Sequence, residues 1–224
     1  MKPVERIEKE NAREYALRAI KENVISLELE PGSLVSEKEV ADVLGLSRTP
    51  VREAFIELGR TNIIEIYPQR GSYVSKIDYE LVEEAGFTRR VLESAIVELL
   101  CTMDIEDQVA KLNEIIHLQQ FYMDEGNPSQ LMKQDNLFHK MLFILARKPQ
   151  TYELMESMEV HFDRVRNMSL QSEKHGGIIA DHKEIVQAVR DKDAEKAKRL
   201  MTEHLFRYKV DEKALRKQYP QYFK

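Results

Sequence analysis

The chain has few of the residues that cross-link or break up small folds. Its 224 residues include one cysteine, no tryptophan, 8 glycines and 7 prolines. A single cysteine, Cys101, excludes an intramolecular disulfide framework and a zinc site built from cysteines, and we expect it to be a small core residue. The scarcity of glycine and proline disfavours a loop-rich all-β fold. The composition therefore favours a mainly helical protein.

The sequence also lacks long apolar runs. No stretch approaches the roughly 20 consecutive apolar residues that a membrane-spanning helix requires. The charged N-terminus contains no apolar segment typical of an export signal, so we expect a soluble, cytoplasmic protein. The net charge of −5 does not indicate nucleic-acid binding, and any contact with DNA must come from a local basic surface.

The pattern of the chain changes near residues 76–78. Before this point, two β-prone runs, 63–67 and 72–75, flank a Pro/Gly turn and predict a hairpin. After it, the apolar periodicity is helical throughout. We predict a mainly α protein, with a winged helix-turn-helix over 1–76 and an all-α antiparallel helical bundle over 78–224. The later helices are expected at about 128–147, 151–170, 178–190 and 193–215.

Residues 37–58 have the pattern of two short helices joined by a tight turn. Ser36 is placed to cap the first helix, and Ser47 is placed to cap the second. Gly45 suits the left-handed residue that ends the first helix. This arrangement is typical of a helix-turn-helix, and the hairpin that follows would be its wing.

The second of these helices carries arginines opposite its apolar stripe. Arg48 and Arg52 lie one turn apart near its N-terminus, where a recognition helix reaches base edges in the major groove. A guanidinium can bond O6 and N7 of guanine together, which contributes about 1–3 kcal/mol of discrimination. At the wing tip, Arg70 beside Gly71 could enter the minor groove. The alternative is an ordinary helical hairpin with solvated arginines, because residues 1–76 hold 12 basic and 13 acidic residues.

Three histidines and one aspartate fall on otherwise apolar faces of the predicted bundle helices. Asp135 and His139 lie one turn apart, and His182 and His204 lie on two later helices. Burying an unpaired carboxylate costs several kcal/mol, and a buried imidazole also needs partners. One divalent metal would satisfy all four groups, and the ligand set suits Zn²⁺, Ni²⁺ or Mn²⁺. Taken singly, each histidine is more often a hydrogen-bonded core residue.

The run GLSRTPVREAF at 45–55, followed by GSYV at 71–74, closely resembles the GntR family of bacterial transcription regulators. The segment 31–37 also fits that family's approach to its second helix. The resemblance implies a DNA-binding winged helix-turn-helix. It places the following residues at DNA-contacting positions, with Ser47 and Thr49 as phosphate or base contacts: Lys38, Ser47, Arg48, Thr49, Arg52, Arg70 and Gly71.

The runs at 135–139, 181–189 and 201–205 resemble the C-terminal FCD-type domain of the FadR subgroup, a helical bundle with a pocket. Many members hold a metal there on one aspartate and three histidines, whereas others bind an acyl-CoA without metal. The four matching positions imply the metal-binding type, with Asp135, His139, His182 and His204 as ligands. The resemblance further suggests that Arg89 clamps an effector carboxylate. The residues alone equally allow a surface pair between Arg89 and Glu93.

The sequence leaves three functions open, of which the first is favoured. The first is a transcription regulator that binds a palindromic operator in double-stranded DNA as a homodimer and senses a small carboxylate effector beside a divalent metal, with zinc as the expected ion. The second is a metal-dependent hydrolase that uses the Asp/His3 site, although no general base is evident. The third is a constitutive DNA binder with a structural histidine cluster. The sequence does not decide whether His161, Arg164 and Arg166 face the pocket.

Overall fold

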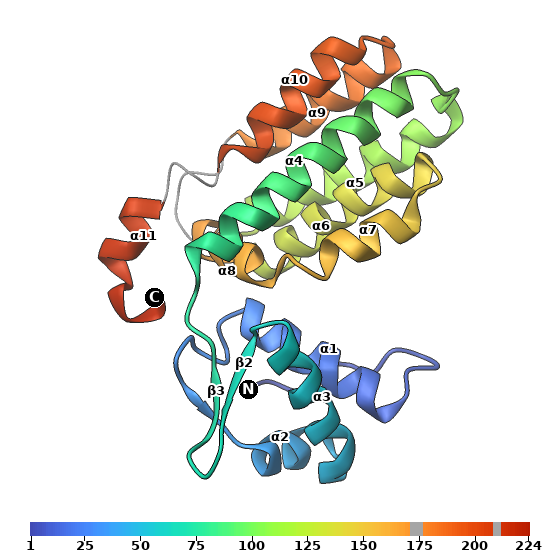
Figure 1. The fold of residues 1–224 in the computed structure, drawn as a ribbon. Coiled ribbons are helices and arrows are strands. Elements are labelled where there is room, and N and C mark those ends of the chain that lie inside the picture. The colour runs from blue at the N-terminus through green and yellow to red at the C-terminus, as the bar shows by residue number, and fades with distance from the viewer. Residues whose placement is uncertain (171–176, 208–211) are drawn as a thin grey trace. The chain divides into compact units, whose positions relative to one another are not determined.

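A computed structural model describes residues 1–170, 177–207 and 212–224 (Figure 1). It contains two compact units, one comprising Met1–Val82 with Arg216–Lys224 and the other comprising Glu83–Leu215. The expected boundary at 76–78 therefore moves to the residue after Val82. The end of the chain, which we expected in the bundle, belongs to the N-terminal unit instead.

The first part of the N-terminal unit contains helices α1 (Ala12–Ile25), α2 (Glu37–Leu44) and α3 (Arg48–Arg60). The Ser36 hydroxyl accepts the backbone N–H of Glu39 at 3.5 Å and caps α2, as predicted. Gly45 ends α2 with φ of 64°, a left-handed conformation that favours glycine. Ser47 occupies the N-cap position of α3, as predicted. Its side chain makes no capping hydrogen bond, so that part of the prediction is wrong.

A small antiparallel sheet completes the winged helix. Strands β2 (Ile64–Tyr67) and β3 (Gly71–Val74) form the predicted hairpin. A third strand, β1 (Leu34–Val35), is not among the predicted elements. It pairs with β3 and makes the strand order β1-β3-β2. Gly71 has φ of 103°, and a Cβ atom there would lie 2.9 Å from Cδ1 of Leu34. The end of the exposed Leu34 side chain can move aside, but the positive φ itself favours glycine at this position.

The second unit is a helical bundle, as predicted. The expected helix over 151–170 is broken into α7 (Pro149–Glu156) and α8 (Val160–Leu170). The two differ in environment, since α7 buries only Tyr152 and Met155 whereas α8 is buried on almost every side. The expected helix over 193–215 ends at Leu205, and residues 208–211 lie outside the described part of the chain. The helices from α4 onward are α4 (Tyr79–Cys101), α5 (Glu106–Asp124), α6 (Pro128–Leu145), α7 (Pro149–Glu156), α8 (Val160–Leu170), α9 (Ile178–Arg190), α10 (Ala194–Leu205) and α11 (Glu212–Gln218).

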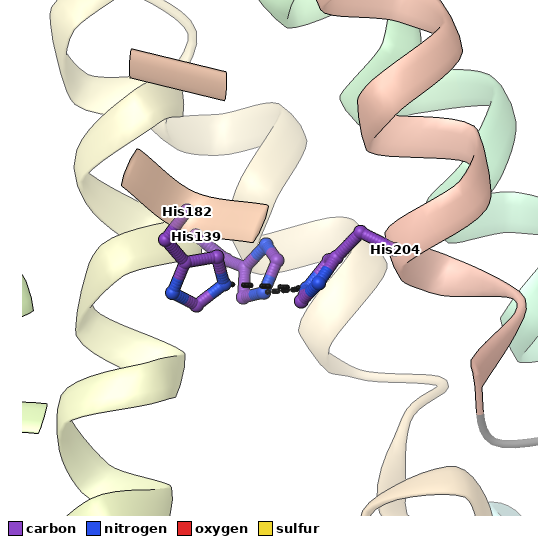
Figure 2. A group of neighbouring side chains, drawn as sticks. All are labelled: His139, His182 and His204. Carbon is purple, nitrogen blue, oxygen red and sulfur yellow. Dashed lines mark hydrogen bonds between the residues drawn. The ribbon is translucent and has the colours of Figure 1, made fainter. Parts of the chain in front are cut away.

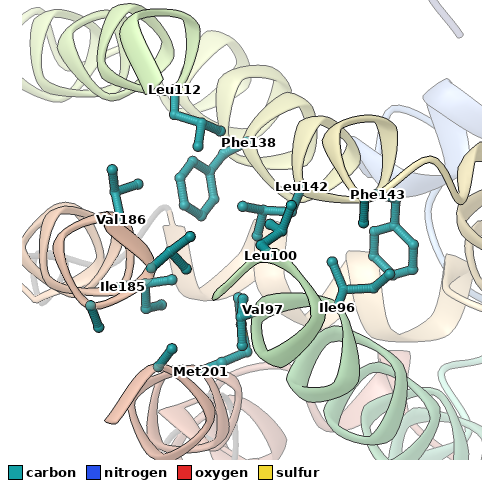
Figure 3. Close-up of a cluster of buried hydrophobic side chains, with 14 of the residues drawn as sticks. Ile96, Val97, Leu100, Leu112, Phe138, Leu142, Phe143, Ile185, Val186 and Met201 are labelled. Carbon is teal, nitrogen blue, oxygen red and sulfur yellow. The ribbon is translucent and has the colours of Figure 1, made fainter. Parts of the chain in front are cut away.

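The bundle is held together by one continuous apolar cluster (Figure 3). Burial of each large aliphatic or aromatic side chain contributes about 1.5–3 kcal/mol. Within the described ranges, no helix is both long enough and apolar enough to cross a membrane. Helices α4, α5, α6, α9 and α10 supply the centre of the cluster, which includes Val97, Leu100, Leu112, Phe138, Leu142, Ile185, Val186 and Met201.

The C-terminal segment joins the N-terminal unit through backbone and ring contacts. The N–H of Ile77 donates to a carbonyl in 222–224 at 2.8 Å, and its own carbonyl accepts from the same segment at 3.1 Å. The rings of Phe223 and Tyr79 stack at 5.6 Å, with the Arg216 guanidinium over both. These contacts explain why residues 216–224 do not continue the bundle.

We expect Phe223→Ala to destabilise the N-terminal unit by about 3 kcal/mol, because it leaves a cavity beside Tyr79. The backbone N–H of Ile77 should then exchange with deuterium faster than in the unchanged protein. Hydrogen exchange and urea unfolding of the full chain measure both effects. Gln221→Ala, at an exposed position of the same segment, is the matched control. Equal behaviour of the two variants would contradict this account of how the C-terminus is held.

Candidate metal centre and nucleic-acid interface

Three histidine side chains from three helices meet inside the bundle (Figure 2). His139 comes from α6, His182 from α9 and His204 from α10, and all three are buried. The Nε2 atom of His204 lies 3.2 Å from that of His182 and 3.4 Å from that of His139. The three predicted inward faces therefore do converge on one point.

The opposite nitrogen of each ring, Nδ1, faces a side-chain oxygen. The pairs are His139 with Glu93, His182 with Gln119 at 2.8 Å and His204 with Asp181 at 3.2 Å. Carboxylate oxygens only accept hydrogen bonds, so they place a proton on the Nδ1 atom that faces them. The Gln119 amide nitrogen donates to the carbonyl of Gln134 at 3.2 Å, which turns its oxygen toward His182.

Because the protons lie on Nδ1, the three Nε2 atoms present lone pairs to one another. Burial lowers the pKa of His139 and lowers that of His182 further, so these rings favour the neutral form. Three converging lone pairs with no proton between them repel unless a cation binds them. This donor set fits a divalent metal, and the Nδ1 partners are of the kind that orient histidine ligands in metal sites.

Asp135 lies beside the same point. Its Oδ1 atom is 3.7 Å from Nε2 of His182, and its Oδ2 atom is 3.9 Å from Nε2 of His139. Oδ1 is buried and accepts no hydrogen bond, whereas Oδ2 is in contact with the Arg166 guanidinium. Burial opposes ionisation of this carboxyl, but Arg166 and the three histidines together outweigh burial and lower the pKa of Asp135. The structure thus brings together all four predicted ligands and leaves one carboxylate oxygen directed at the histidines.

Arg89 is buried next to this cluster, so the alternative of a surface pair with Glu93 is wrong. Only 2% of Arg89 is exposed, and its Nε atom donates to Glu93 at 2.6 Å inside the bundle. Burial disfavours the Glu93 carboxylate, yet Arg89 and His139 together lower the pKa of Glu93 to about 2. A chain of contacts therefore runs from Arg89 through Glu93 to His139.

Sequence reasoning missed Glu93, Gln119 and Asp181 as partners of the histidines. Glu93 carried one usable signal, its place one turn from Arg89 on an apolar face. Gln119 and Asp181 carried no comparable signal, because their roles depend on which helices become neighbours.

Helix α8 carries His161, Arg164 and Arg166, whose positions the sequence left undecided. It adds further charged side chains to the interior of the bundle. Arg164 is wholly buried and donates to His161 at 2.7 Å, and Arg166 also bonds Asp163 at 2.7 Å. Burial lowers the pKa of Arg164 to about 9. Burial likewise raises the pKa of Glu159, at the start of this segment, to about 7.

In the N-terminal unit, every residue expected to contact DNA is exposed. The apolar stripe of α3, which includes Val51 and Phe55, is buried, so Arg48 and Arg52 on the opposite side face solvent. The hydroxyl of Ser47 is not used for capping. The exposed set is Lys38, Ser47, Arg48, Thr49, Arg52, Arg70 and Gly71.

Two different family models match the chain, one over the N-terminal unit and one over the helical bundle. Residues 13–74 match the model for bacterial regulatory proteins of the gntR family, and residues 84–207 match the FCD domain. The chain belongs to the GntR family. It is similar to the HTH-type transcriptional repressor RspR of Escherichia coli K12, with 32% identity over 84% of this chain and 83% of the relative. The gluconate operon transcriptional repressor of Bacillus subtilis is 28% identical over 80% of this chain and 74% of the relative.

Solved structures share the fold of this GntR-family protein. E. coli McbR/YncC superposes with a TM-score of 0.79 at 22% identity, covering 93% of this chain and 99% of that one. A GntR regulator from Rhodococcus sp. RHA1 gives a TM-score of 0.73 at 24% identity, covering 95% and 99%. The protein is a DNA-binding transcription regulator with an FCD effector-binding domain. These families and relatives are regulators and not enzymes, which removes the hydrolase alternative.

We expect Arg48→Ala and Arg52→Ala each to weaken binding to the specific operator by about 1–3 kcal/mol, because each removes a guanidinium from the base-reading end of α3. Arg60→Ala, at the exposed C-terminal end of the same helix, removes an equal charge and should have a smaller effect. Mobility shift on DNA from upstream of the gene, at fixed salt, measures all three. Equal losses for the three variants would show that charge alone, and not base contact, governs binding.

Proposed function

We propose that this GntR-family regulator holds a divalent metal in its FCD domain and senses a small carboxylate beside that metal. In the same proposal, it acts as a homodimer on a palindromic operator, since one winged helix reads too few base pairs. The observation that carries the proposal is the convergence of three buried Nε2 lone pairs with the unbonded Oδ1 atom of Asp135.

The proposed metal ligands are Asp135, His139, His182 and His204. Three imidazoles and one carboxylate suit Zn²⁺ as the expected ion, with Ni²⁺ or Mn²⁺ as alternatives. Arg166 occupies the second oxygen of Asp135 and so favours binding of the metal through Oδ1 alone. A metal that accepts more than four ligands would keep open positions, at which it could bind a carboxylate oxygen as a Lewis acid.

The charges around the cluster support an anionic effector. Apart from Asp181, whose charge is paired with that of Arg207, three guanidiniums and four carboxyl groups surround the cluster. One of these carboxyl groups, Glu159, has a pKa raised to about 7, so the formal net charge lies between −1 and 0, and a divalent ion makes it positive. Net charge in a buried site is costly, and a bound anion would reduce it. The side chains counted are Arg89, Arg164, Arg166, Glu93, Asp135, Glu159 and Asp163.

Arg89 is the proposed partner of the effector carboxylate. Its contact with Glu159 is long, at 3.6 Å, and that oxygen of Glu159 has no hydrogen bond. An effector carboxylate could replace Glu159 at the guanidinium without disturbing the 2.6 Å bond to Glu93. Such an effector changes DNA binding only if it binds one conformation of the regulator more tightly than the other.

We expect the purified protein to contain close to one metal ion per chain and the His182→Ala/His204→Ala variant to contain almost none. His117→Ala, an exposed histidine on α5, should keep the metal. Elemental analysis measures the content, and equal content in all three proteins would refute the site. Gluconate is a suitable first effector, because one relative is named for a gluconate operon. If metal-free protein shifts operator DNA with the same response to gluconate, the histidine cluster is structural only.

The Nδ1 partners should tune metal affinity. We expect Gln119→Met to weaken metal binding about 10–100-fold, because His182 loses the acceptor that keeps its Nε2 unprotonated. Gln119→Glu retains an acceptor and should bind at least as well as the unchanged protein. Gln120→Met, whose amide bonds Asp124 instead, is the control. Titration against a chelating dye measures the affinities, and an unaffected Gln119→Met variant would contradict the proposed tautomer.

A further inference from the structure

One carboxylate inside the bundle faces a guanidinium without a hydrogen bond to it. Glu159 lies in the short segment between α7 and α8 and is only 4% exposed. Its Oε1 atom is 3.6 Å from Nε of Arg89 and accepts no hydrogen bond from the described part of the chain. An ionised oxygen in a protein interior normally accepts at least one hydrogen bond, so this position is costly for a charged carboxylate. Attraction between opposite charges alone holds this oxygen near Arg89.

We propose that Glu159 holds the effector's place at Arg89 until an effector carboxylate displaces it, and that the displaced Glu159 then takes up one proton from solvent. The inference rests on the carboxylate effector of the proposed function and adds how its binding is regulated. The O–H bond that forms on Glu159 is the only covalent change, and the proton comes from water or buffer. The regulator therefore responds to pH as well as to its effector.

The charges around Glu159 place its protonation near neutral pH. Burial is the largest influence and raises the pKa of Glu159, two carboxylates raise it further, and two guanidiniums lower it. The resulting pKa is about 7, so a modest change in the surroundings alters the charge of this group. The charged and titratable side chains that surround it are Arg89 and Glu93 on α4, Tyr152 on α7, and Asp163 and Arg166 on α8.

An effector carboxylate at Arg89 shifts this balance in one direction. It places another negative charge beside Glu159 and occupies the guanidinium that favours the ionised form. Both changes raise the pKa of Glu159 further, so the group binds a proton at neutral pH. Glu93 is not displaced in this exchange, because it bonds Nε of Arg89 at 2.6 Å and also contacts His139.

Stability without any ligand tests the state of Glu159. Because its folded pKa is raised, its contribution to stability is present at low pH and is lost as the pH rises to about 7. Relative to Glu159→Gln, whose amide does not ionise, the unfolding equilibrium constant of the unchanged protein should rise by up to about tenfold per pH unit over this range. Urea unfolding of the full chain measures it. Glu153→Gln, at an exposed position on α7, should behave as the unchanged protein, and the same behaviour of Glu159→Gln would overturn the proposal.

Calorimetric titration of the full, metal-loaded chain tests the exchange itself. Gluconate and acetate are the probes, because their own carboxyl groups, with pKa values of about 4, stay ionised at neutral pH. As the pH rises above about 7, the affinity of the unchanged protein should fall by up to about tenfold per pH unit. The heat of binding should also differ between buffers of different ionisation enthalpy, as uptake of a proton requires.

The Glu159→Gln variant should bind the probes at least as tightly, with neither dependence, because it has no carboxylate to displace. Binding to the unchanged protein without proton uptake would refute this proposal alone. Binding of neither probe at any pH would refute the proposed carboxylate effector as well.

Discussion

Three imidazoles directed at one point form the interaction on which the interior of the bundle depends. His139, His182 and His204 lie on different helices, and each is turned by an acceptor on its outer nitrogen. The inner nitrogen of His204 is left 3.2 Å from that of His182 and 3.4 Å from that of His139, distances at which lone pairs repel. An apolar core alone does not favour such an arrangement, whereas a shared cation does.

Charged side chains around the three histidines connect them to other helices of the bundle. Glu93 joins His139 to Arg89, and Arg166 joins Asp135 to α8. Arg89, Glu93 and Asp135 are buried, so each of the two carboxylates needs its guanidinium to remain ionised. The polar interior is therefore one connected network inside an apolar shell, and a ligand that binds any part of it alters the electrostatics of the whole.

The chain itself links this network to the DNA-reading unit. Helix α4 begins at Tyr79, within the N-terminal unit, and carries Arg89 and Glu93 further along. The chain returns to that unit at its end, where Phe223 packs on Tyr79. Two covalent connections thus join the two units, and both pass through the region around Tyr79.

The sequence by itself determined the features that depend on neighbouring residues. The cap at Ser36, the left-handed Gly45, the hairpin and the inward faces of the histidine helices each follow from a few consecutive residues. Tertiary structure alone decided the partners far apart in the chain. Glu93 lies 46 residues from His139, and Gln119 lies 63 residues from His182, so no local pattern relates them. The two-residue strand β1, the break between α7 and α8 and the docking of 216–224 likewise depend on packing between distant segments, which periodicity along one helix does not encode.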